Sequence, residues 1–149
     1  MSLGTICNRE VVIVESKASI PEAAGLMREY HVGCLVVVEE RYGRNFPIGI
    51  LTDRDIVIEL IAKEVDTNAV TVGDVMSHEM TLAREDDDVI DTLKRMRYKG
   101  IRRIPVVDDQ GALIGLITLD DLLELLAEQL KDLASLVSKE QQSEQKAHP

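Results

Sequence analysis

The sequence predicts an α/β (α+β) fold built from two copies of one unit, each running strand, helix, strand, strand, helix. The motif Gly-apolar-apolar-Thr-x-x-Asp occurs at residues 49–55 and again at 115–121. Residue 72 matches residue 3 in the earlier parts of the copies, and residue 115 matches residue 49 in the later parts. Internal repetition of this kind indicates a duplicated structural unit. We expect the copies to pack sheet to sheet about a pseudo-twofold axis, with an extended helix at the C-terminus.

The change of offset between these two matches locates an insertion. The first copy has three extra residues, which fall in the loop 41–47, where Gly43 and Pro47 mark a connection that tolerates added length. We therefore divide the chain into a first repeat at residues 1–68 and a second repeat at 69–127. Residues 128–149 form a C-terminal helix extension and polar tail.

The first copy contains one short β-branched run, one capped helix and two continuous apolar runs. We predict a strand at 11–14, a helix from residue 19, strands at 35–38 and 48–51, and a helix from about 53 to 63. Ser19 is placed to cap the first helix, Pro21 suits its first turn, and Glu22 completes a capping box. Continuous apolar runs are typical of strands buried on both faces.

The second copy repeats this order. We predict a strand at 80–82, a helix after the acidic run 85–88, a hairpin of strands 104–107 and 113–117, and a helix from about residue 119. The acidic run could hold a divalent cation. Carboxylates at a helix N-terminus also cap free N–H groups and offset the helix dipole, and we favour this interpretation, with no metal site expected.

The last helix carries an apolar seam. Leucine and valine side chains recur at spacings of three, four, three and four residues, at Leu123, Leu126, Leu130, Leu133 and Val137. This spacing is typical of about two heptads of a coiled coil. The seam either folds back as core or meets its own copy in a homodimer, and we favour the homodimer.

Composition excludes several classes of protein. The 149 residues carry a net charge of −10, which argues against general nucleic-acid binding. No apolar run approaches the ~20 residues that span a bilayer, and the first residues lack the features of a signal peptide, so we expect a cytoplasmic protein. Cys7 and Cys34 both stand at apolar positions of the pattern, where small buried hydrophobic residues are expected rather than redox centres.

The motifs together resemble a tandem pair of CBS domains, often called a Bateman module, of the small stand-alone kind. The resemblance covers about residues 3 to 127. Its specific marks are Gly49-x-x-Thr52-x-x-Asp55, Gly115-x-x-Thr118-x-x-Asp121, the segment 72–76 and the segment 103–108. It implies a regulatory module that binds AMP, ADP, ATP or S-adenosylmethionine as a signal of metabolic state.

The resemblance also implies which residues bind the ligand. Asp55 and Asp121 would accept hydrogen bonds from the ribose hydroxyls, with charge strengthening both bonds. Thr52 and Thr118 would donate to ribose or phosphate beside free backbone N–H groups. By matching positions, the remaining pocket residues would be Leu116, Val12 and Val32 for one site, and Ile50, Thr81 and Ile101 for the other.

Phosphate groups would meet the basic residues Arg102 and Arg103 near the centre of the module. The first copy has Gly33 and Cys34 at the matching positions, so the resemblance implies two unequal sites. Basic residues are concentrated here in an otherwise acidic chain, at Lys94, Arg95, Arg97, Lys99, Arg102 and Arg103. Lys94, Arg95 and Arg97 would form a solvated helix face, so only Arg102 and Arg103 support an anionic ligand.

Three alternatives remain beside ligand sensing. Each Thr-x-x-Asp could be a helix cap alone, which would leave a ligand-free scaffold for dimerisation or interaction. A bond between Cys7 and Cys34 could gate the cleft in a redox-responsive module. Catalysis is the weakest class, because His31, His78 and His148 are scattered and no HExxH, nucleophile elbow or Walker loop occurs. We therefore expect no enzyme and a protein partner that the sequence does not identify.

Overall fold

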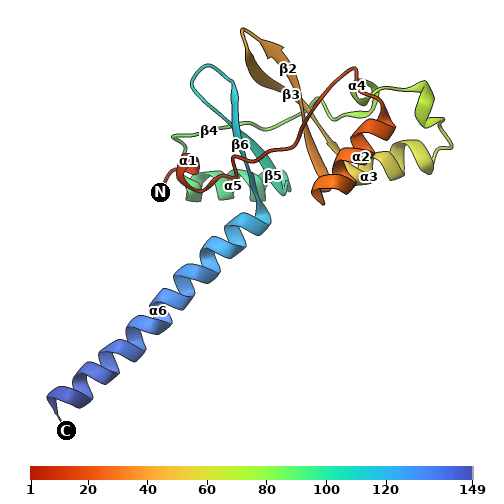
Figure 1. The fold of residues 1–149 in the computed structure, drawn as a ribbon. Helices are drawn as coiled ribbons and strands as arrows, with labels where there is room; N and C mark the ends of the chain where they lie inside the picture. Colours follow the sequence, from red (N-terminus) through yellow and green to blue (C-terminus); the bar gives the residue numbers. More distant parts are fainter. Residues whose placement is uncertain (149) are drawn as a thin grey trace. The chain divides into compact units, whose positions relative to one another are not determined.

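The computed structural model describes residues 1–148, and they form two compact units, residues 1–117 and the unit that begins at Thr118. The first copy contains α1 (Leu3–Ile6), β1 (Ile13–Glu15), α2 (Ile20–Tyr30), β2 (Cys34–Arg41), β3 (Arg44–Thr52), α3 (Asp53–Asp55), the π-helix η1 (Ile56–Ile61) and the 3₁₀ turn η2 (Thr67–Ala69). The second contains α4 (Val72–Val75), β4 (Ala83–Arg84), α5 (Val89–Lys99), β5 (Arg103–Val107), β6 (Leu113–Thr118) and α6 (Leu119–Ala147) (Figure 1).

Each copy contributes one three-stranded sheet. The strand orders are β1-β2-β3 and β4-β5-β6, the same order of matched strands in both copies. β1 runs parallel to β2, β2 runs antiparallel to β3, and β4 runs parallel to β5. Parallel neighbours need a crossover connection, which α2 and α5 supply. The predicted mixed α/β fold with two equivalent sheets and a C-terminal helix is confirmed.

The burial of matched residues follows the repeat. Leu35, Val37 and Leu51 of the first copy match Ile104, Val106 and Ile117 of the second, and all six side chains are fully buried. Met27 and Met96, on the inward faces of α2 and α5, are also buried as a matched pair. Both cores are therefore aliphatic, as the low aromatic content predicts.

The three extra residues of the first copy lengthen its hairpin instead of forming a loop. β2 and β3 pair from Cys34 and Thr52 out to Arg41 and Arg44, with a register shift between Val37 and Val38. Tyr42 and Gly43 close the hairpin with φ angles of 54° and 74°. Two consecutive positive φ angles match the twist of a two-residue hairpin turn. A bulge of this kind absorbs added residues while both strands stay paired.

Two further elements differ from the sequence-based expectation. The helix predicted from 53 to 63 begins at Asp53 but continues as a π-helix over Ile56–Ile61, and the chain leaves it through Glu64 at a φ of 56°. The strand predicted at 80–82 lies at Ala83–Arg84. Ala83 pairs with Val106 and its side chain is 1% exposed, so burial against β5 and not β-propensity sets the strand.

Each copy begins with a short leading segment, and the two segments are exchanged between the copies. In the leading segment 3–8, the N–H of Leu3 donates to the carbonyl of Asp87 and that of Gly4 to Glu85. In the leading segment 72–77, the N–H of Val72 donates to Ala18 and that of Gly73 to Ser16. Figure 1 shows α1 beside β4 and α4 beside the elements of the first copy. Each leading segment therefore completes the other repeat.

The exchanged segments also add to the sheets, and this explains the glycine of the repeated motif. Ile50 exchanges two backbone hydrogen bonds with Ser77, at 3.1 and 2.9 Å, and Leu116 exchanges two with Asn8, both at 2.9 Å. Gly49 precedes Ile50 and Gly115 precedes Leu116, so each glycine lies under a crossing segment. A side chain at either position would meet that segment.

The two hairpins of unit 1 are joined by Arg44 and Asp108. The guanidinium of Arg44 donates to the carboxylate of Asp108, and also to Oε1 of Gln110 at 3.1 Å. Burial alone would raise the pKa of Asp108, but hydrogen bonds from Arg44 and from the backbone N–H groups of Ala112 and Gln110 lower it below its ordinary value. This pair links residues 64 positions apart and joins the hairpin of one copy to that of the other.

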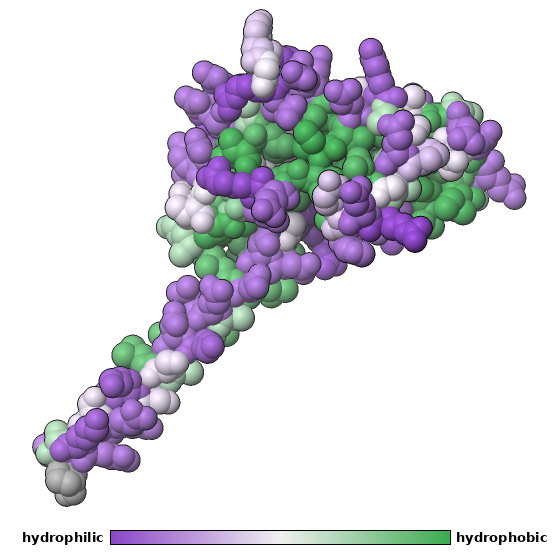
Figure 2. Space-filling view, in the orientation of Figure 1, coloured by the Kyte–Doolittle hydropathy of each residue, from purple (hydrophilic) through white to green (hydrophobic). Residues whose placement is uncertain are grey.

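The second unit is α6, a single continuous helix from Leu119 to Ala147. It passes residue 128, where the C-terminal extension was placed by sequence, without a break. In residues 1–148 no helix combines the length and the apolar character that a membrane span requires. Figure 2 shows apolar and polar side chains together along this helix.

Candidate functional site

Thr52 and Asp55 form a reciprocal cap where β3 leads into α3. Oγ1 of Thr52 accepts a hydrogen bond from the N–H of Asp55 at 3.1 Å, and Oδ2 of Asp55 accepts from the N–H of Thr52 at 2.9 Å. Thr118 and Asp121 repeat this arrangement at the start of α6, with 3.2 and 3.0 Å. Both predicted binding motifs therefore cap a helix, as the alternative interpretation requires.

A third Thr-x-x-Asp shows how much capping explains. Thr71 and Asp74, which are not among the predicted ligand residues, make the same box at the start of α4, and the carboxylate of Asp74 accepts from the N–H of Thr71 at 2.9 Å. The sequence pattern by itself thus indicates a capped helix. A ligand site needs further groups beside the cap.

Asp55 has a carboxylate oxygen unused by residues 1–148 and lines a hollow beside the cap. Its Oδ2 is used by Thr52, while its Oδ1 accepts no hydrogen bond from residues 1–148. Asp55 lines a hollow of about 480 Å³ between η1 and α4, whose wall includes Asp74, Ser77 and Leu60. This volume is within the range of small-molecule sites. One carboxylate oxygen is therefore available to a hydroxyl group.

Charged groups of both copies converge on the thiol of Cys34. Burial raises the pKa of this thiol to about 11, the positive Arg103 opposes the rise, and Asp55 and Asp53 add to it. Charges shift a pKa strongly only at short range. The charges of Asp55 in the first copy and of Arg103 in the second therefore both reach one thiol. That they form one ligand site stays a prediction. No carboxylate of residues 1–148 lies within ion-pair distance of the half-buried Arg103.

The sequence-based prediction did not include Asp53, whose side chain lies against Gly33. A β-carbon added to Gly33 would lie 2.9 Å from a carboxylate oxygen of Asp53, and the N–H of Asp53 donates to the Gly33 carbonyl. The second copy has Leu119 at the position of Asp53 and Arg102 at that of Gly33. Reading the differences between the copies, and not only their shared motif, would have identified this acidic side chain.

Comparison with known proteins identifies the family. A family model for the CBS domain matches residues 3–62 and 72–128. The chain belongs to the CBS-domain family. The match comprises two CBS repeats, and both repeats end near the helices that follow the Thr-x-x-Asp boxes.

Relatives of this CBS pair occur in archaea and bacteria. Protein MK0525 of Methanopyrus kandleri is 38% identical over 125 residues, covering 84% of this chain and 62% of the relative, so the chain spans less than two thirds of that protein. The CBS domain-containing protein YhcV of Bacillus subtilis is 36% identical over 113 residues, covering 76% of each.

A solved structure of a similar CBS pair contains ligands. The CBS domain pair of protein MJ0100, in complex with 5′-methylthioadenosine and S-adenosyl-L-methionine, has a TM-score of 0.74 and 26% identity to this chain. The similarity covers 87% of this chain and 98% of that one. Adenosine compounds are thus bound by a neighbour with the same fold.

Four of the apolar residues predicted to line the two sites of the CBS pair are half-buried. Ile50 is half-buried in β3 beside Ser77, and Leu116 is half-buried in β6 beside Asn8. Val12 and Val32 are half-buried and pack against the core of the first repeat. Val12 accepts a hydrogen bond from the N–H of Val36. All four are thus on the surfaces of cores and not deep within them.

The remaining predicted residues come from the second CBS repeat. Thr81 accepts a hydrogen bond from Nζ of Lys99 at 3.0 Å, and the N–H of Ile101 donates to Met96 at the end of α5. Arg102 is exposed. Thr81 and Ile101 are absent from the wall of the hollow that contains Asp55. Their joint site with Asp55 therefore stays a prediction.

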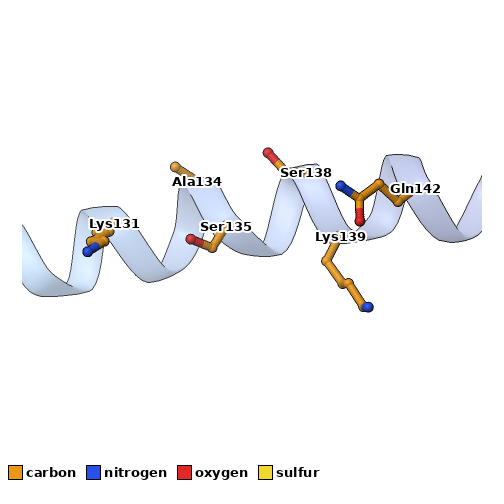
Figure 3. A pocket seen from close by; sticks show the side chains of 6 residues that line it. All are labelled: Lys131, Ala134, Ser135, Ser138, Lys139 and Gln142. Carbon is orange, nitrogen blue, oxygen red and sulfur yellow. The ribbon is translucent and has the colours of Figure 1, made fainter.

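Two other hollows are lined by none of the aspartate and arginine residues predicted to bind the ligand. One of about 410 Å³ lies beside β1 and α2, lined by residues such as Glu15, Lys17 and Leu26. Another follows α6 alone, lined by Lys131, Ala134, Ser135, Ser138, Lys139 and Gln142. Figure 3 shows that these six side chains come from one stretch of a single helix, so small residues between longer ones create this hollow.

The raised pKa of Cys34 predicts an unreactive thiol. At pH 8 a thiol with a pKa of about 11 has roughly a hundredfold less thiolate than one at the ordinary value of 9.0. We expect iodoacetamide to modify Cys34 at least about a hundredfold more slowly in the folded protein than in urea, as measured by peptide mass spectrometry. Equal rates would contradict this expectation.

Proposed function

We propose that this CBS pair is a regulatory module that binds an adenosine-containing ligand, AMP, ADP, ATP or S-adenosylmethionine, between its two repeats. The observation that carries the proposal is that Asp55 of one repeat and Arg103 of the other both act electrostatically on the thiol of Cys34. One offers a free carboxylate oxygen for ribose hydroxyls, and the other is a half-buried cation with no carboxylate partner in residues 1–148. A diol acceptor beside an anion acceptor suits a nucleotide.

Thr52 would donate to ribose or phosphate, and Ile50, Thr81 and Ile101 would complete the pocket of Asp55. A second site, with Thr118, Asp121, Leu116, Val12 and Val32, remains part of the proposal on the strength of the repeat. Arg102 would support the phosphates with Arg103. Because Gly33 and Cys34 replace these arginines in the first copy, we propose that the two sites differ in affinity for phosphorylated ligands.

The module would act without catalysis, in the cytoplasm, as a homodimer. Ligand binding would favour one packing of the repeats over another, and a regulated protein partner would read this population shift. The neighbour that binds methylthioadenosine and S-adenosylmethionine supports the adenosine class. The three capping boxes support the second candidate, a ligand-free dimerisation scaffold, because they account for the Thr-x-x-Asp motif without any ligand.

A thermal-shift panel separates these functions. Protein freed of co-purified nucleotide is heated with AMP, ADP, ATP, S-adenosylmethionine, NADH or GTP, and any hit is measured by calorimetry. A ligand at ~100 times its dissociation constant adds about 2.7 kcal/mol to stability, so we expect a clear rise in Tm with at least one adenosine compound. No rise with any of them would leave the scaffold as the function.

An arginine variant then tests how the ligand is held. In Arg103→Gln the affinity for a phosphorylated hit should fall while the affinity for adenosine is unchanged, because only the phosphates meet the arginine. If S-adenosylmethionine alone raises Tm, the phosphate role of Arg103 is wrong while the adenosine site stands. An equal loss for adenosine and its phosphates would instead indicate a structural role.

A further inference from the structure

α6 exposes one row of apolar side chains along most of its length. Leu123, Leu126, Leu130, Leu133 and Val137 are each between 54% and 60% exposed. They lie on one face of the helix because spacings of three and four residues return to the same side. A 29-residue helix normally owes its stability to packing of such a face. In the unit formed by α6 this face is open.

The positions that flank this row carry no charge. In the heptad that places Leu123 at a and Leu126 at d, the e and g positions hold Leu122, Ala127, Gln129, Ala134, Leu136 and Gln141. Flanking charges normally set partner choice in coiled coils. Here no like charges oppose contact between two identical helices, and Leu136, itself 62% exposed, widens the apolar face. The surface is therefore suited to a second copy of itself.

The distribution of charge along the chain gives the pair a direction. Residues 119–132 carry five carboxylates and one lysine, whereas residues 133–147 carry two lysines and two glutamates. The chain before α6 is also acidic, with 20 carboxylates against 14 basic residues in positions 1–118. Parallel pairing would bring these acidic segments together at one end. Antiparallel pairing sets each acidic half beside the neutral half of its partner.

We propose that α6 pairs with the α6 of a second copy in an antiparallel two-stranded coiled coil. The apolar row repeats in both directions, so a register centred between Leu130 and Leu133 aligns Leu130 with the partner's Leu133, and Leu126 with the partner's Val137. Ser135, Ser138 and Lys139 fall at the f, b and c positions of the same heptad, away from the apolar row, and these exposed residues remain in solvent. This assignment rests on the homodimer proposed above and names its surface.

A pair of aspartate variants of the full chain tests the surface. Leu130→Asp places a charge in the seam, and Ser135→Asp adds the same charge on the opposite side of the helix. We expect sedimentation equilibrium to give a dimer for the wild type and for Ser135→Asp. For Leu130→Asp the dissociation constant should rise at least about a hundredfold, because two leucines per dimer are lost from the interface and two charges are placed there.

Other results would overturn the assignment at different levels. A dimer that Leu130→Asp leaves unchanged would place the interface elsewhere on the chain while keeping the homodimer. A monomeric wild type at tens of micromolar would remove the homodimer as well, and would assign the seam to contact within one chain. A wild-type trimer or tetramer would contradict the two-stranded pairing. None of these results depends on ligand binding, so the sensor function is tested separately.

Cysteine crosslinking tests the direction. Leu130→Cys and Leu133→Cys are made in separate chains, oxidised alone or as a mixture, and the linked peptides are identified by mass spectrometry, with the wild type as control for Cys7 and Cys34. Antiparallel pairing predicts a link between 130 and 133 that forms only in the mixture. A link of 133 to 133 in the single variant would show parallel pairing and overturn the proposed direction.

Discussion

Replacing Gly49 by alanine is expected to destabilise the protein by about 1–3 kcal/mol, the usual effect of overpacking. The added β-carbon would lie 2.6 Å from Sδ of Met76 and 2.9 Å from the carbonyl oxygen of Ser77. The methionine side chain can move, but the Ser77 oxygen is held by the hydrogen-bonded pair of Ser77 with Ile50. The strain must therefore push the leading segment 72–77 away from the first repeat.

Gly115→Ala should have the same effect on the other exchanged segment. Its β-carbon would lie 2.7 Å from Sγ of Cys7 and 2.9 Å from the carbonyl oxygen of Asn8. Urea unfolding followed by circular dichroism measures both changes. Gly25→Ala is the matched control, because Gly25 lies in the exposed part of α2 with nothing within 4 Å of the added carbon.

The control should change stability in the opposite direction. Alanine in a helix interior is favoured over glycine by roughly 0.5–1 kcal/mol, so Gly25→Ala should raise the free energy of unfolding. If Gly49→Ala and Gly115→Ala proved as stable as the wild type, the close approach of the leading segments would not be the reason for the motif glycines.

Asp55→Ala is expected to weaken the binding of the adenosine ligand by about ten- to a hundredfold. Removing a charged acceptor from a hydrogen bond costs about 1.5–3 kcal/mol, and 1.4 kcal/mol corresponds to a factor of ten. The variant also loses the cap on the N–H of Thr52, so its Tm without ligand should fall. Calorimetry with the ligand that raises Tm most measures the affinity independently of this effect.

Asp88→Ala provides the comparison for the loss of a cap. Asp88 accepts hydrogen bonds from the N–H groups of Ile90 and Asp91 at the start of α5, outside the predicted sites. This variant should lose stability while keeping the wild-type ligand affinity. Should Asp55→Ala behave in the same way, Asp55 would be a helix cap alone and its ribose role would be excluded.

Much of the fold could be predicted because the sequence contains two copies of the same pattern. The matched positions of Leu35 and Ile104, or of Leu51 and Ile117, are buried in both copies, so one alignment of the sequence with itself located both cores. The hydrogen bond from the N–H of Glu22 to Oγ of Ser19 was also predictable, because a capping interaction joins residues only three positions apart. Local signals and repetition gave the elements and their order.

Contacts between distant segments could not be read in this way. Neither copy's sequence indicates that the backbone N–H of Leu3 donates to Asp87, or that of Val72 to Ala18. The same sequence pattern would result if each leading segment packed against its own repeat. The π-helix after Asp55 is a further case, since Ile56, Leu60 and Ile61 fit an α-helical stripe equally well. Tertiary packing decides both features.

The sequence singled out Asp55 because the copies share its motif, and Arg103 because they differ there, but it did not single out Asp53. Asp55 stands in a shared motif, and its charge and that of Arg103 both act on the pKa of Cys34. Asp53 has no acidic counterpart in the second copy, so the repeat concealed it. Its position against Gly33 depends on the close approach of two segments, which only the folded chain reveals.

The exchange of leading segments has a consequence for how the protein is made. The core of the first repeat includes Val72 and Met76, which the ribosome synthesises after the rest of that repeat. The first repeat therefore cannot complete its core until those residues leave the exit tunnel. The N–H groups of Leu3 and Gly4 must also remain unpaired with their final acceptors until residues more than eighty positions later have been synthesised. Within residues 1–117, neither repeat can therefore complete its fold before the other has been synthesised.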